Sequence, residues 1–215
     1  MKVIGITGGI GSGKSALLNA IGQEYKCRIL LADDIANFLK EPGQSCYDPI
    51  VYLLGRDVLD EAGLIDKRKM SDKIFGNEAL LELVNDIVHP AVKHYICKCI
   101  EEEREKGQVD FVFVEAALFI EAGYRDIVDS LWYIFAREEV RIHRLQEGRG
   151  LTLEKIHSIL NNQLQEEVFR RHCDVVIDNS DSLENSMAQV HRNLQKHEIM
   201  LYCQRKQWQL YICGQ

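Results

Sequence analysis

The stretch "GITGGIGSGKS", residues 5–15, decides the fold because it joins a strand pattern to a helix pattern through a glycine-rich turn. The short run Lys2-Val3-Ile4, apolar after its lysine, precedes it, and the stretch from 13 to 25 has the apolar spacing of a helix. Its second part fits G-x-x-x-x-G-K-[ST], a pattern whose backbone N–H groups converge on phosphate. We therefore expect a phosphate-binding loop made of Gly8, Gly9, Ile10, Gly11, Ser12, Gly13, Lys14 and Ser15.

Two residues of the loop have expected roles of their own. In this pattern the lysine, here Lys14, reaches the β- and γ-phosphates of a nucleotide. The hydroxyl of Ser15 is placed to bind Mg²⁺. A glycine turn with a purely structural role is the alternative, and the flanking strand and helix patterns argue against it.

The composition suits a globular chain of one domain, or of one domain with insertions, because it has 215 residues and is 46% hydrophobic. A net charge of −7 disfavours nucleic acid as the main partner. The seven cysteines have no zinc-ligand spacing, which indicates free thiols in a reducing compartment. No stretch reaches the roughly 18 apolar residues of a membrane span, and no signal-peptide layout is present. We expect a cytoplasmic protein without a membrane partner, monomeric or a small homo-oligomer.

Strand and helix patterns alternate along the chain, which predicts an α/β fold with a doubly wound, parallel five-stranded sheet. The expected strands are residues 2–7, 27–33, 110–117, 127–136 and 174–179. A helix over 77–105 is expected to be interrupted at His89-Pro90. We expect a nucleotide-binding core (about 1–40, 106–140 and 174–198), a helical acceptor-binding insertion (about 41–105), a helical lid (about 141–173) and an unassigned tail (199–215).

The phosphate loop is shared by GTPases, ATP-driven motors and small kinases. The chain has neither the guanine-reading N-K-x-D nor an L-S-G-G-Q-like signature. A kinase needs an acceptor site, a base near the acceptor hydroxyl and basic residues over the transferred group. Asp33 ends the second expected strand, next to the loop in a β-α-β unit, and is the candidate base. The alternative is that Asp33 or Asp34 caps the following helix.

Five segments in this order resemble the dephospho-coenzyme A kinase family from residue 3 to about 195: "GITGGIGSGKS", "ADDIANFLKEPG", "VHPAV", "EAALFIEAGY" and "CDVVIDNSDS". The resemblance implies an ATP- and Mg²⁺-dependent phosphotransferase that acts on the ribose 3′-hydroxyl of dephospho-coenzyme A, the last step of coenzyme A synthesis. Another small-molecule kinase, or an ATP-binding module without catalysis, are the alternatives.

On the acceptor side, the resemblance assigns several residues. Asp33 matches the second Asp of the family's "D-A-D" and would be the base, while Leu31 replaces the first Asp and Asp34 an apolar residue. His89 and Pro90 match the family's "H-P", with a helix-breaking proline beside a core histidine as the alternative.

The segment "EAALFIE" (115–121) is expected to contribute to both sites. Leu118 and Phe119 would form an apolar wall, and Glu121 would anchor the acceptor. Glu115, at a strand end, would hold a water on Mg²⁺, or else form a cap or a salt bridge.

In the lid, the family carries "R-L-x-x-R-D". Arg144 keeps the first arginine as a nucleotide ligand, while Gly148 stands where the second is expected. A loop beside Gly148 and Gly150 would slide by one residue, which makes Arg149 the candidate clamp on the phosphoryl group.

Two further lid and core positions complete the expected site. A basic family position falls on Phe169, so Arg170 or Arg171 would take that role. Asn179 is expected near the adenine, or else as a cap on the last helix.

Overall fold

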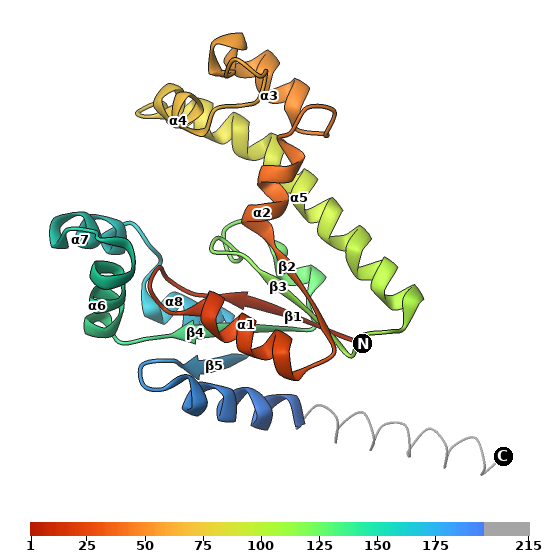
Figure 1. Ribbon diagram of the computed structural model, residues 1–215, viewed down its shortest axis with the longest axis vertical. Coiled ribbons are helices and arrows are strands. Elements are labelled where there is room, and N and C mark those ends of the chain that lie inside the picture. The colour runs from red at the N-terminus through yellow and green to blue at the C-terminus, as the bar shows by residue number, and fades with distance from the viewer. Residues whose placement is uncertain (196–215) are drawn as a thin grey trace. The chain divides into compact units, whose positions relative to one another are not determined.

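The computed structural model describes residues 1–195, so the expected tail at 199–215 lies outside the described residues (Figure 1). The chain forms two compact units. The first unit comprises Met1–Gly5 and Lys26–Asp129, and the second comprises Ile6–Tyr25 and the chain from Ser130 onward.

Five strands form one parallel sheet in the order β2-β3-β1-β4-β5, which confirms the predicted fold class. Their bounds are β1 (Lys2–Thr7), β2 (Cys27–Leu31), β3 (Phe111–Glu115), β4 (Ser130–Phe135) and β5 (Val175–Asp178). Strand β3 lies between β1, which leads into the loop, and β2, which precedes Asp33.

The first unit carries four α-helices: α2 (Ala32–Leu39), α3 (Tyr47–Leu54), α4 (Lys67–Ile74) and α5 (Glu78–Lys106). Two 3₁₀ turns, Arg56–Val58 and Tyr124–Ile127, complete it. Helices α3 and α4 pack against α5 (Figure 1).

Helix α5 is continuous for 29 residues with Pro90 inside it, so the predicted interruption at His89-Pro90 is wrong. An internal proline costs a helix about 3 kcal/mol. Against this, α5 buries Val84, Val92, Ile96 and Ile100, and each such side chain contributes about 1.5–3 kcal/mol. Burial on both sides of the proline therefore outweighs the local penalty.

Strand β2 ends at Leu31, and α2 begins at once with Ala32. Asp33 and Asp34 therefore lie in the first turn of a helix rather than at the end of a strand. The N-cap is Leu31, and no side chain caps the helix, so neither aspartate is the expected cap. Carboxylates in a first turn are favoured by the helix dipole.

The second unit contains α1 (Lys14–Glu24), α6 (Glu138–Arg149), α7 (Leu153–Asn161), α8 (Glu166–His172) and a helix over residues 183–195. Strand β4 is its centre, with Leu131, Trp132 and Ile134 fully buried. Helix α8 packs on β4 through Phe169, whose ring stacks on Tyr133 with centroids 4.6 Å apart. Phe169 is therefore a packing residue of the second unit.

Helix α6 runs through Gly148 to Arg149 and ends at Gly150, which has a left-handed φ of 61°. The expected sliding loop at Gly148 does not exist, because this glycine is helical. Among residues 1–195, no helix has the length and apolar content that crossing a membrane requires. The five cysteines in the same range are free thiols, as expected: Cys27, Cys46, Cys97, Cys99 and Cys173.

Candidate functional site

The phosphate loop of the second unit depends on its glycines. Gly8, Gly11 and Gly13 have φ values of 149°, 77° and 87°, a region that other residues rarely adopt. A Cβ on Gly8 would overlap the carbonyl oxygen of Ile134, and one on Gly13 would overlap Asn179 Nδ2. Gly13 also forms the N-cap of α1, so the loop leads directly into a helix N-terminus. This arrangement favours an anion.

The expected cation of the loop, Lys14, folds back over it. Its Nζ donates hydrogen bonds to the carbonyl oxygens of Gly8 at 2.7 Å and Gly9 at 3.4 Å. Ser15 is exposed in the first turn of α1, so its hydroxyl is accessible to a ligand. Lys14 and Ser15 are thus the first two residues of α1, directly after Gly13.

Arg144 and Asn179 meet at Ser12. The Ser12 carbonyl accepts from Asn179 Nδ2 at 2.7 Å and from Arg144 Nη1 at 3.3 Å, while Arg144 Nη2 donates to the Asn179 carbonyl at 2.9 Å. Asn179 Oδ1 accepts from the Ser186 hydroxyl at 2.7 Å. The last helix is instead capped by Ser182, whose hydroxyl accepts from Asn185 N. Asn179 therefore braces the loop and is not the helix cap.

One polar atom of the loop lacks a partner. Ser12 is 1% exposed, and its hydroxyl oxygen makes no hydrogen bond within the described part of the chain. A buried hydroxyl is normally paired. An oxygen-rich ligand in the loop would supply the missing partner.

Arg141 and Gln163 contact the loop as well, and the sequence analysis missed both. Arg141 Nε donates to the Ile10 carbonyl at 2.9 Å, and its Nη2 donates to Gln163 Oε1 at 2.7 Å. The same Gln163 oxygen accepts from Ile10 N at 3.1 Å. Arg141 lies three residues before Arg144 on α6, a spacing that shares a helix face and could have revealed it. Nothing local marks Gln163, which lies between α7 and α8.

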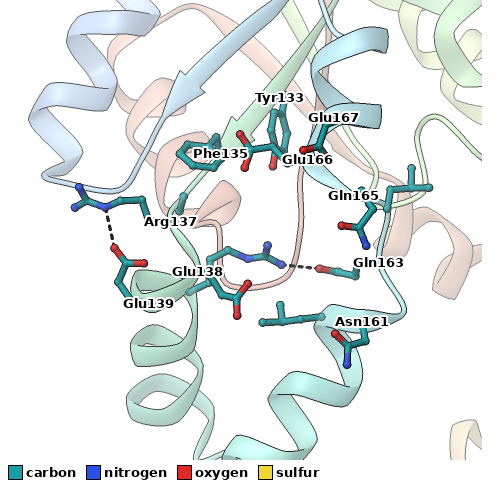
Figure 2. A pocket seen from close by; sticks show the side chains of 14 residues that line it. Tyr133, Phe135, Arg137, Glu138, Glu139, Asn161, Gln163, Gln165, Glu166 and Glu167 are labelled. Atoms are coloured by element: carbon teal, nitrogen blue, oxygen red, sulfur yellow. Dashed lines mark hydrogen bonds and ion pairs between the residues drawn. The ribbon is translucent and has the colours of Figure 1, made fainter.

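These two side chains line a cavity of about 460 Å³. Figure 2 shows Gln163 reaching into it, with its hydrogen bond to Arg141 dashed. Burial lowers the pKa of the Arg141 guanidinium. Burial also raises the pKa of Tyr133, another lining residue, to about 12.

The remaining candidate arginines lie elsewhere. Within residues 1–195, no hydrogen bond or ion pair joins Arg149, Arg170 or Arg171 to the loop. Arg170 pairs with Glu166 at 2.6 Å and stacks over the Phe135 ring. Arg149 is exposed in the last turn of α6.

In the first unit, a pocket of about 110 Å³ brings together three predicted acceptor residues, Asp33, His89 and Leu118. Asp33 and Leu118 are exposed there, and His89 is half-buried. Small and apolar side chains complete the lining with Tyr124: Ala32, Ala36, Val88, Val92, Ala116, Ala117 and Ala122.

Tyr124 holds this wall in place. Its hydroxyl donates to the His89 carbonyl at 3.0 Å, and burial raises its pKa to about 12, which keeps it a neutral donor. Phe119 packs edge-on against Tyr124 and is fully buried, so it belongs to the core rather than to an exposed wall.

Three further predicted residues lie outside this lining. Pro90 and Glu121 are exposed. Glu115 is half-buried at the end of β3, paired in register with Leu31.

Comparisons with known proteins agree along the chain. The family model described as Dephospho-CoA kinase matches residues 2–185. The dephospho-CoA kinase of Carboxydothermus hydrogenoformans is 35% identical over 91% of this chain and 94% of that protein. The dephospho-CoA kinase of Corynebacterium diphtheriae is 36% identical over 85% of this chain and 90% of that protein.

Solved structures show the same fold. The crystal structure of TT1252 from Thermus thermophilus matches with a TM-score of 0.73 and 28% identity, covering 91% of this chain and 97% of that one. The structure of the dephospho-CoA kinase from Campylobacter jejuni matches with a TM-score of 0.66 and 20% identity. The match covers 90% of this chain and 96% of that one. With a matching family model and two relatives above 30% identity, the chain belongs to the dephospho-CoA kinase family.

Proposed function

We propose that this chain transfers the γ-phosphoryl group of ATP to the ribose 3′-hydroxyl of dephospho-coenzyme A, giving coenzyme A and ADP. Membership of the family supports the reaction. The observation that supports the residue assignment is the pocket lined by Asp33, His89 and Leu118, three residues that the sequence predicts for the acceptor side.

The second unit would bind the nucleotide. The N–H groups of the loop and Lys14 would hold the triphosphate, and Arg144 and Asn179 would brace the loop near the adenine. Mg²⁺ takes oxygen ligands and keeps several waters. The exposed Ser15 hydroxyl would bind it, the Glu115 carboxylate is the candidate that the sequence offers for holding a water on it, and the ion would neutralise charge on the phosphates.

The first unit would bind the acceptor. The Asp33 carboxylate would accept the proton of the attacking hydroxyl. A pocket of about 110 Å³ is far smaller than sites that bury a drug-sized ligand, about 300–1,000 Å³. It would therefore hold only a small part of the acceptor, with Pro90 and Glu121 contributing at its surroundings.

The predicted regions keep their proposed roles. Residues 41–105 would bind the acceptor, and 141–173 would act as the lid that excludes water. Arg149 is the candidate that the sequence offers for the phosphoryl clamp.

The test measures ADP release from Mg·ATP with and without dephospho-coenzyme A, while mass spectrometry follows coenzyme A. We expect equal amounts of ADP and coenzyme A, and only with the acceptor present. Turnover with a different alcohol alone would identify another small-molecule kinase. ATP binding without turnover of any acceptor would make the chain a binding module and overturn the proposal.

A further inference from the structure

We propose that Arg141 is a phosphate-binding residue, and that the amide oxygen of Gln163 occupies the position of a nucleotide phosphate oxygen until ATP displaces it. The inference rests on the proposed function only for its ligand, a nucleoside triphosphate.

The hydrogen-bond pattern around Gln163 is the first argument. Its Oε1 accepts from Ile10 N at 3.1 Å and from Arg141 Nη2 at 2.7 Å. Ile10 lies inside the phosphate loop, whose N–H groups are the donors that bind anions in this pattern. A single acceptor that bridges a loop N–H and a guanidinium makes the contacts of a phosphate oxygen.

The incomplete pairing of Arg141 is the second argument. A guanidinium has five N–H donors and stays protonated. Within residues 1–195, Arg141 makes two hydrogen bonds, to Ile10 O and Gln163, and no ion pair within 4.0 Å. The side chain is half-buried, so its charge is partly desolvated. The Glu138 carboxylate attracts the guanidinium from beyond ion-pair distance without pairing with it, and a partly desolvated cation of this kind favours binding of an anion.

The position of the guanidinium indicates which phosphates it would bind. A Cβ added to Gly9 would overlap Arg141 Nη2, so the guanidinium lies directly against this glycine. The carbonyl of Gly9 lies 3.4 Å from Lys14 Nζ. Because the lysine of this motif serves the β- and γ-phosphates, Arg141 lies at the same end of the nucleotide.

The arginines on either side of Arg141 have other partners. Arg137, the N-cap residue of α6, pairs with Asp181 at 3.1 Å. It also pairs with Glu139 at 3.3 Å (Figure 2). Arg144 donates to two backbone carbonyls. The cavity of about 460 Å³ beside Gln163 leaves room for its amide to turn away from the loop. Arg141 therefore has both the charge and the space to exchange partners.

Calorimetry of ATP and AMP binding to the full chain, without acceptor, tests the proposal. Arg141→Gln removes the charge, and we expect it to weaken ATP binding about 10- to 100-fold and AMP binding much less. Gln163→Glu places a permanent carboxylate against Arg141, and we expect a comparable loss of ATP affinity while the melting temperature of the free protein does not fall. Gln163→Ala removes the competing oxygen, and we expect ATP to bind about 3- to 10-fold more tightly while the free protein melts at a lower temperature.

The expected changes in ATP affinity have opposite signs: ATP binds more weakly to Arg141→Gln and Gln163→Glu, and more tightly to Gln163→Ala. A merely structural role of these residues would weaken ATP binding in all three variants. Arg137→Gln, in the same cavity, is the matched control and should bind ATP like the unmodified protein. Unchanged ATP affinity in Arg141→Gln, a weaker affinity in Gln163→Ala, or a larger loss in Arg149→Gln than in Arg141→Gln would each overturn the proposal.

The binding measurements still test the proposal if one variant fails to fold or if the protein turns over no acceptor. If Arg141→Gln does not fold, Gln163→Glu and Gln163→Ala decide, since both keep the arginine. A protein that binds ATP as expected yet turns over no acceptor would sink the proposed function and leave this inference standing.

Discussion

The phosphate loop and the pocket proposed for the acceptor are built in different ways. In the loop, hydrogen bonds hold the backbone at Gly8, Ile10 and Ser12. The pocket proposed for the acceptor is lined mainly by alanine and valine, and the Tyr124 hydroxyl holds its wall by donating to the His89 carbonyl. Donors aimed at an anion must be fixed before it arrives, because reorganisation during the reaction is costly. A pocket for part of a larger acceptor needs mainly shape.

The strongest disruption of the loop is Lys14→Ala. It removes the cation that contacts two loop carbonyls and that we propose binds the transferred phosphate, so we expect kcat/KM to fall about 10³-fold or more. Steady-state kinetics with Mg·ATP measures this. Lys155→Ala, exposed on α7, is the control. A decrease of less than tenfold in Lys14→Ala would contradict the assigned role.

Asp33→Asn tests the proposed role of the pocket, and Asp34→Asn, in the same helical turn, is its control. Only Asp33 lines the pocket. If it is the base, we expect kcat to fall about 10²- to 10⁴-fold with little change in ATP affinity, and Asp34→Asn to have a small effect. Similar kcat values for both variants would show that the position in the pocket does not matter.

Gly13→Ala tests whether the phosphate loop needs its observed backbone conformation. Gly13 has a φ of 87°, and a Cβ there would overlap Asn179 Nδ2. We expect a loss of about 1–3 kcal/mol in unfolding free energy, together with weaker ATP binding. Urea denaturation measures the first effect and calorimetry the second. Unchanged values in both would mean that the loop does not need its observed bend.

Gly148→Ala should have the smallest effect, and it should raise the unfolding free energy where Gly13→Ala lowers it. Gly148 is inside α6, and a Cβ there would meet nothing within 4 Å. Alanine in a helix interior is favoured over glycine by about 0.5–1 kcal/mol. We expect a higher urea midpoint and unchanged ATP binding. A lower midpoint would contradict the helical conformation of Gly148.

Local patterns predicted much of this protein. The strands, the phosphate loop and most helix positions followed from periodicity and glycine spacing, as did the grouping of Asp33, His89 and Leu118 by resemblance. Errors occurred where packing overrides local preference. Pro90 lies within α5 because aliphatic burial on both sides exceeds its penalty.

By itself, the sequence determined the loop, because the conformations that Gly8, Gly11 and Gly13 permit are a property of glycine. Only the tertiary structure decided which side chains meet it. Arg141 and Gln163 reach Ile10 from positions 131 and 153 residues away in the chain, and no local pattern encodes such contacts. Their partners are set by how α6 and the segment between α7 and α8 pack around the loop, since side chains distant in sequence converge only once the fold has formed.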